Sequence, residues 1–167
     1  MALSLDELAE TGLQFSAKAC RYVAESECGH LHPPLMLFTI DDRGEVEHQG
    51  FDEDELDDLT TEQLTAKLKE RIIETGASGC VFIYDADVNF VRINEETKEE
   101  TSEEMDSIIT VVGHPEGVRG WVTLHEVHPA TNRRSFHPPM ELKDGEVLQF
   151  FLSVLPPWKV PEGITIN

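Results

Sequence analysis

The chain has 167 residues, with 33 acidic residues against 13 lysines and arginines and a net charge of −20. This length suits one domain with a hydrophobic core, and a hydrophobic content of 40% excludes bulk disorder. The charge repels nucleic-acid backbones and anionic membranes and so argues against direct binding to either. A cation, a basic protein partner or a salt-rich environment would each suit such a surface.

The N-terminal segment predicts an amphipathic helix over residues 4–27. Ser4 and Glu7 have the spacing of a capping box, in which each side chain satisfies the backbone N–H of the other residue. Apolar residues then recur along one helical stripe. Gly29 is the expected C′ residue, and the two prolines that follow it prevent continuation of the helix.

A β-hairpin is predicted next, with strands over 35–41 and 45–51 and a turn over 42–44. In the second strand the side chains alternate, which indicates that one face of the hairpin meets water. Residues 52–58 are almost all acidic, and we expect them to form a loop.

The stretch that follows predicts a second helix over 61–75 and then the central strand. Thr60 and Gln63 offer another capping box, and Gly76 ends the helix. Residues 80–84 are all apolar or aromatic, a pattern typical of a strand covered on both faces. This strand is expected to continue to residue 93.

The C-terminal half predicts further strands. We expect an exposed loop over 94–107, strands over 108–112, 120–128 and 146–155, a turn over 114–117, a long loop over 129–145 and a tail after 160.

The element order is thus α-β-β-α-β-β-β-β. It predicts an α+β domain over residues 1–160, in which two main helices pack on a mostly antiparallel sheet of five to six strands, and a tail over 161–167. The order of elements resembles that of the roadblock and dynein-light-chain proteins and their profilin-like relatives. The segments 32–38 and 107–112 are also similar to a group of uncharacterised small bacterial α+β proteins, over residues 30–127. These resemblances imply a fold and no activity.

Oxygen-bearing side chains after the central strand suggest a calcium loop. Asp85, Asp87, Asn89 and Glu96 fall at positions 1, 3, 5 and 12 of an EF-hand loop. Phe90 stands at position 6, where the sharp turn requires glycine. The alternative is a strand whose polar face meets water, and we rank it above the calcium site.

Histidines form a second candidate site. His30 and His32 alternate with Cys28, and three more histidines follow near the C-terminus; together these side chains could bind zinc. Their spacings match no structural zinc pattern, and the alternative is a set of turn and surface residues. The three C-terminal candidates are His125, His128 and His137.

The segment from Gly120 to Pro129 resembles the Gly-Trp…His-x-His-Pro segment of JAMM metallopeptidases. The resemblance implies a metal-dependent hydrolase in which Glu126 acts as general base. Here His125 and His128 are three residues apart rather than two, and the serine-to-aspartate spacing that should follow is missing.

Three cysteines make an odd count. Cys20 and Cys28 would lie about 12 Å apart in a helix, too far for a disulfide, so we expect reduced thiols in a cytoplasmic protein. Cys28, close to two histidines, is the better candidate nucleophile, and Cys80 is expected to pack as a small hydrophobe. We find no apolar signal core and no stretch of transmembrane length.

The C-terminal strand is more apolar than one covered face requires. Such an edge strand invites pairing with a second subunit, unless a helix covers it within the monomer. The apolar residues are Phe150, Phe151, Leu152, Val154, Leu155 and Trp158.

The leading hypothesis is a non-catalytic, acidic cytoplasmic domain that acts by protein–protein contact, as a homodimer. A small metal-dependent hydrolase that uses His125 and His128 is the first alternative. The second is an inhibitor whose acidic runs, 52–58 and 95–106, mimic a polyanion and occupy a basic partner.

Overall fold

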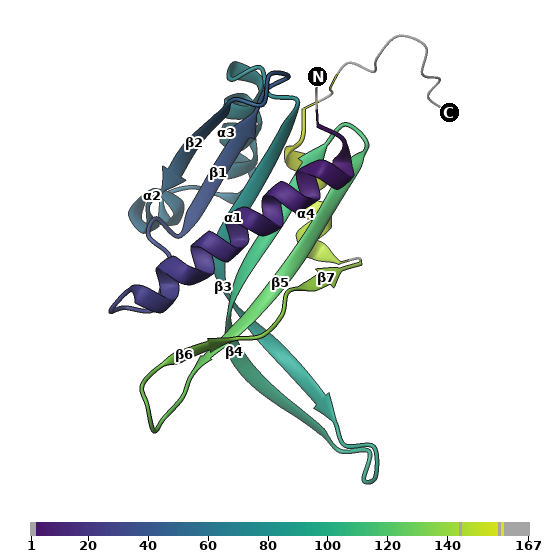
Figure 1. Cartoon of the computed structure of the whole chain (residues 1–167). Coiled ribbons are helices and arrows are strands. Elements are labelled where there is room, and N and C mark those ends of the chain that lie inside the picture. The colour runs from purple at the N-terminus through teal and green to yellow at the C-terminus, as the bar shows by residue number, and fades with distance from the viewer. Residues whose placement is uncertain (1–2, 144, 157, 159–167) are drawn as a thin grey trace.

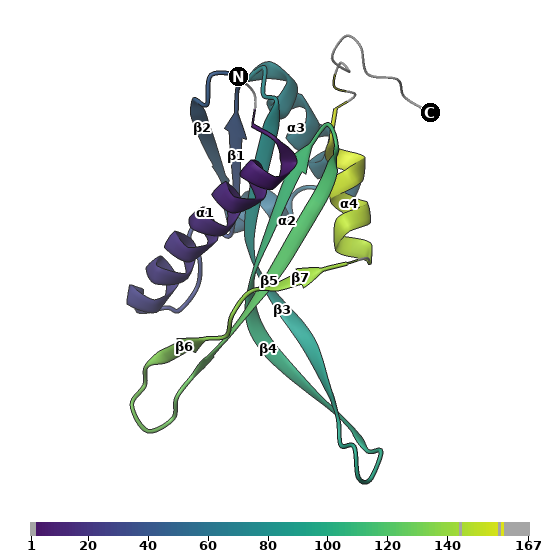
Figure 2. The same ribbon diagram turned by 45° about the vertical axis from the view of Figure 1, so that its right-hand side comes forward.

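The computed structural model describes residues 3–143, 145–156 and 158. Within them, seven strands form one antiparallel sheet in the order β2-β1-β3-β4-β5-β6, and β7 pairs with β5 beside β6. Helix α1 crosses one face of this sheet, and α3 and α4 cover the other (Figures 1 and 2). The α+β class and the antiparallel sheet are confirmed, although the sheet has more strands than predicted. The tail predicted for 161–167 lies outside the described residues.

The bounds of the elements in the first half are α1 Leu5–Glu25, β1 Leu35–Ile40, β2 Val46–Phe51, α2 Glu53–Asp57 and α3 Thr61–Glu74. Those in the second half are β3 Gly79–Ile93, β4 Glu100–His114, β5 Gly117–Val127, β6 Arg134–Phe136, β7 Met140–Leu142 and α4 Glu146–Val154.

Helix α1 begins where the capping residues predict. The Ser4 hydroxyl accepts a hydrogen bond from the Glu7 N–H at 3.2 Å and donates one to the Glu7 carboxylate at 3.1 Å, so only half of the capping box forms. The helix ends earlier than predicted, because Ser26 adopts an extended conformation and its hydroxyl bonds to the Val23 carbonyl. The prediction that Gly29 is the C′ residue is therefore wrong: Gly29 lies in the loop beyond, at φ +69°.

The acidic run 52–58 is not a loop. Residues Glu53–Asp57 form the short helix α2, whose first turn is acidic. Negative side chains there are favoured by the helix macrodipole, and Leu56 packs against the core. Helix α3 has both hydrogen bonds of the predicted capping box, between Thr60 and Gln63, at 3.1 Å and 2.9 Å.

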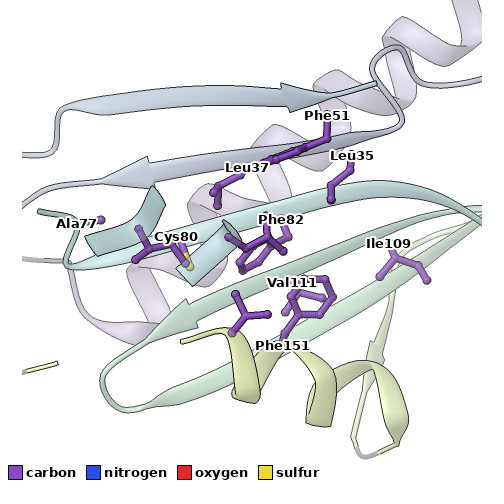
Figure 3. Close-up of a cluster of buried hydrophobic side chains, with 12 residues drawn as sticks. Leu35, Leu37, Phe51, Ala77, Cys80, Phe82, Ile109, Val111 and Phe151 are labelled. Carbon is purple, nitrogen blue, oxygen red and sulfur yellow. The ribbon is translucent and has the colours of Figure 1, made fainter. Parts of the chain in front are cut away.

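Strand β3 is buried at the centre of the sheet, as predicted. Val81 and Ile83 face α1, whereas Phe82 faces α3 and α4, and none of the three is more than 1% exposed. Figure 3 shows Phe82 stacked near Phe151 of α4, with the ring centroids 4.5 Å apart. This strand continues to Ile93, as expected.

Residues 94–107 are not a long loop. Strand β4 begins at Glu100, which is paired with Ile93, and only residues 94–99 form the turn. The Asn94 side chain accepts hydrogen bonds from the N–H groups of Glu96 and Thr97 and closes this turn. The sequence hides the strand because its side chains here are polar on both faces.

The predicted last strand is a helix, and the long loop before it contains β6 and β7. Leu148, Phe151 and Val154 recur every three residues and form the buried face of α4. Gly145, at φ +118°, precedes the helix. The apolar residues of this segment therefore cover the core of the same chain, and the edge strand that was expected to pair with a second subunit does not exist.

Candidate functional site

The three C-terminal histidines do not converge. His125 is buried in β5 and faces α1, whereas His128 and His137 are exposed on either side of β6. His137 Nε2 lies 3.4 Å from a carboxylate oxygen of Glu126, and His128 Nδ1 accepts the Ala130 N–H. Within the part of the chain that the structure describes, no group of three or more His, Cys, Asp or Glu side chains could hold a metal ion.

The cysteine and histidines after α1 are also separated. Cys28 Sγ lies 3.7 Å from the His30 carbonyl oxygen and 3.9 Å from the Ser26 hydroxyl, and neither group is a base that could activate the thiol. His32 is exposed. Burial raises the pKa of Cys80 to about 12, so its thiol stays protonated in the core, as expected of a small hydrophobe.

The residues of the predicted calcium loop lie along an extended strand. Asp85, Asp87 and Asn89 share one face of β3, and Glu96 lies in the turn beyond Ile93. Alternate strand positions do not converge on one point, so the EF-hand geometry does not form.

The structure does assemble a polar cluster beside the C-terminal end of α1, which sequence spacing did not reveal. The Arg134 guanidinium lies 3.2 Å from the Asp106 carboxylate and 2.8 Å from His125 Nδ1. Asp85 lies on the same face of the sheet, with His30 Nδ1 4.0 Å from its carboxylate. The cluster joins β3, β4, β5, β6 and the loop after α1. Its members are His30, Asp85, Asp106, His125 and Arg134.

His125 is neutral in this cluster. Arg134 can only donate a hydrogen bond, so Nδ1 of His125 accepts it and Nε2 carries the proton. That Nε2 is buried without a hydrogen-bond partner among the described residues. Burial lowers the pKa of His125, and the positive charge of Arg134 lowers it further. A neutral, enclosed imidazole of this kind holds the strands together and has no open position for a substrate.

Asp85 anchors the loop after α1 to the sheet. Its carboxylate accepts a hydrogen bond from the Leu31 N–H. Burial raises the pKa of Asp85, while the bond from Leu31 and the charge of His30 oppose that rise. We interpret the cluster as one that stabilises the fold, because each of its charged groups already has a partner within the protein.

The most prominent external feature is a projecting hairpin, which we call the arm and define as residues 89–104. It consists of the distal halves of β3 and β4 and extends beyond all other elements (Figures 1 and 2). Strand β1 pairs with β3 only as far as Tyr84, and β5 pairs with β4 only from Asp106. Neither edge of the arm therefore pairs with another described strand.

The arm is acidic and has two exposed apolar side chains. Six of its residues are acidic and two are basic. Val91 is 53% exposed and Ile93 is 60% exposed, both on the face of β3 that continues from Asp85. Unpaired edges and exposed β-branched residues are typical of a surface that receives another chain.

An apolar cavity lies on the opposite face of the sheet from α1. This α3–α4 pocket has a volume of about 450 Å³ and lies where α2, α3 and α4 meet the sheet. Its wall contains Pro34, Leu35, Leu56, Leu64, Leu68, Tyr84, Asp85, Glu146, Val147, Phe150 and Phe151.

Sequence reasoning missed the arm, the pocket and the polar cluster for different reasons. The alternation of Asp85, Asp87 and Asn89 did indicate an uncovered strand face, and extending it through the acidic residues to Asp106 would have indicated the arm. The pocket depends on α4, which was expected to be a strand. The cluster depends on the pairing of β5 with β6, which no local pattern reveals.

No family model matches this chain, and neither a curated protein nor a solved structure matches it. Among the described residues, no helix is long and apolar enough to cross a membrane.

Proposed function

We propose that this protein is a non-catalytic interaction domain whose acidic arm binds a basic protein partner. The observation that carries the proposal is the arm itself, a two-stranded ribbon that no other element covers within the described part of the chain. Ribbons of two strands are marginally stable in water when they are isolated. A chain that pairs with one of its edges would supply the missing hydrogen bonds and cover the apolar side chains.

The backbone of β3 supports docking by strand addition. The Asp85 N–H donates to the Pro34 carbonyl, on the side where β1 lies. Because backbone groups alternate along a strand, those of Asn89, Val91 and Ile93 point to the same side, beyond the end of β1. An extended partner segment could continue the sheet there, with its alternate side chains beside Val91 and Ile93.

The charge of the arm favours a basic partner over a second copy of this chain. Two copies would each carry a net charge of −20, and their arms would repel each other at low salt. The homodimer was also expected because of an apolar last strand, and that segment is α4. A basic partner is compatible with both hypotheses from the sequence, protein–protein contact and polyanion mimicry. In both cases the arm is the acidic surface that the partner contacts.

A labelled peptide of alternating lysine and valine tests this function by fluorescence anisotropy at low and moderate salt. The arm variant replaces four exposed glutamates by glutamine. We expect its affinity to fall at least tenfold and the salt dependence of binding to weaken, because most of the attraction is lost. The substitutions are Glu99→Gln, Glu100→Gln, Glu103→Gln and Glu104→Gln.

A matched control has the same net charge and an intact arm. Exposed glutamates on α1, α3 and two turns are replaced, and we expect near wild-type binding. Equal loss in both variants would mean that only net charge matters and would reject the arm as the site. A dimer in light scattering, lost in the arm variant, would favour the second copy instead. The control substitutions are Glu10→Gln, Glu27→Gln, Glu70→Gln and Glu116→Gln.

A further inference from the structure

The α3–α4 pocket is an open hollow that is lined mostly by apolar side chains from five parts of the chain. Leu64 and Leu68 of α3 form one side, and Val147, Phe150 and Phe151 of α4 form the other. Leu56 of α2, Tyr84 of β3 and the beginning of β1 complete the wall. A volume of about 450 Å³ lies within the range of small-molecule sites, and most of the wall is hydrophobic, as such sites require.

Aromatic rings form one end of this cavity. Phe150 meets Phe151 edge to face, with centroids 5.0 Å apart, and Tyr84 lies 5.8 Å from Phe151. Burial raises the pKa of Tyr84 to about 12, and its hydroxyl has no hydrogen-bond partner among the described residues. The rings offer flat contact surfaces to an apolar ligand, and the hydroxyl offers one polar contact.

The charges in the wall are negative. Asp85 contributes to the wall, but its carboxylate is bound to Leu31 and follows the side chains that face α1. Glu146, in the first turn of α4, is exposed and pairs with no basic side chain in the described part of the chain, so its carboxylate faces solvent at the pocket. Among the residues that the structure describes, no lysine, arginine or histidine lines the pocket. A fatty acid would thus meet only repulsion, whereas a cation would be attracted.

We propose that the α3–α4 pocket binds an apolar amine, whose hydrocarbon body lies between α3 and α4 and whose ammonium group pairs with Glu146. The apolar body accounts for the leucine and phenylalanine walls, and the ammonium accounts for a rim that, among the described residues, carries the Glu146 carboxylate and no basic side chain. The proposal is independent of the function of the arm, because the pocket lies on the body of the protein.

Isothermal titration of the full chain with dodecylamine, dodecanoate and dodecanol tests the ligand class, since the three share one hydrocarbon chain. We expect dodecylamine to bind at least tenfold more tightly than dodecanoate, with dodecanol between them. Equal binding of the amine and the carboxylate would overturn the proposal, as would the absence of heat with dodecylamine at millimolar concentration.

Two tryptophan variants separate binding in the pocket from attraction to the acidic surface. Leu64→Trp fills the cavity, and Leu152→Trp adds the same ring to the exposed side of α4, where Leu152 is 47% exposed. We expect Leu64→Trp to abolish binding of dodecylamine and Leu152→Trp to preserve it. Unchanged binding in Leu64→Trp would place the amine elsewhere and reject the pocket. Val147→Trp, which fills the cavity from α4, replaces Leu64→Trp if that variant does not fold.

The role of Glu146 is tested with Glu146→Gln, which keeps the size of the side chain. Because an exposed ion pair contributes little, the affinity for dodecylamine should fall by about two- to fivefold, while that for dodecanol stays unchanged. An equal fall for both ligands would show that Glu146 does not pair with the ammonium group.

Discussion

Arg134 donates a hydrogen bond to Nδ1 of His125 at 2.8 Å, so a cation is bound to the accepting nitrogen of a buried imidazole. This contact exists only while His125 is neutral, because a protonated ring has no lone pair to accept with. The other charged groups that face it are Asp106, which attracts a proton to the ring, and His30, which opposes one. A titratable group thus holds β6 against β5.

The first prediction concerns the pH dependence of stability. The pKa of His125 is lowered in the folded protein, whereas the unfolded chain takes up this proton near pH 6.5. The unfolded state therefore binds more protons below about pH 6.5, and the free energy of unfolding should fall as the pH drops towards the folded pKa. Urea unfolding at a series of pH values from neutral to mildly acidic measures it.

Two variants show whether His125 is the source of this loss. His125→Phe should flatten the curve in that range, while His128→Gln, an exposed histidine, should leave it unchanged. A curve of the same shape in His125→Phe would assign the effect to other groups.

The second prediction concerns Gly29, which lies under the Arg134 guanidinium. A Cβ at Gly29 would lie 2.2 Å from a terminal nitrogen of Arg134. We expect Gly29→Ala to destabilise the fold by about 1–3 kcal/mol through strain and the displaced arginine. Gly44→Ala is the matched control, since Gly44 also has a positive φ but open space around it. Equal losses of unfolding free energy would mean that only backbone strain matters at Gly29.

The third prediction tests the buried face of α4. Phe151 is 3% exposed and stacks on Phe82, so Phe151→Ala should lower the unfolding free energy by about 3–5 kcal/mol. Its neighbour Leu152 is 47% exposed, and Leu152→Ala should cost less than about 1 kcal/mol. Similar losses for the two substitutions, measured in urea, would contradict the helical orientation of this segment.

The fourth prediction concerns removal of the arm. Val88 and Met105 are paired across the hairpin, so an Asn-Gly turn between them replaces residues 89–104 with a two-residue loop. Because the described side chains of the arm are exposed, the body should keep its near-UV circular dichroism and its unfolding free energy to within about 1 kcal/mol. A body that unfolds without the arm would make the arm part of the core.

Much of the fold could be predicted where local patterns and burial agree. The apolar run marks β3 because its side chains are buried, and Ser4 and Thr60 mark the starts of α1 and α3 because their hydroxyls accept hydrogen bonds from backbone N–H groups. The local pattern does not decide the structure of the segment 146–155, because its apolar residues fit the periodicity of a helix as well as that of a strand. The tertiary structure shows that it is a helix, whose buried face packs on the sheet through the contact between Phe151 and Phe82.

The site was harder to predict than the fold. Acidic residues from 94 to 107 read as a loop because strand patterns depend on a covered face, and the arm has none. The spacing of the histidines does not show which way their side chains point. Only the tertiary structure shows that His125 is buried and His128 is exposed. The pairing of Arg134 with Asp106 likewise follows from strand register.

Tyr84 is the last residue of β3 that pairs with β1, and it also forms part of the wall of the α3–α4 pocket. Tyr84 therefore lies where the pairing of β3 with β1 ends and the part of β3 that leads to the arm begins. Strand β1 holds the backbone of Tyr84, and Phe151 of α4 packs 5.8 Å from its ring, so the body of the protein sets the direction in which the arm leaves the sheet.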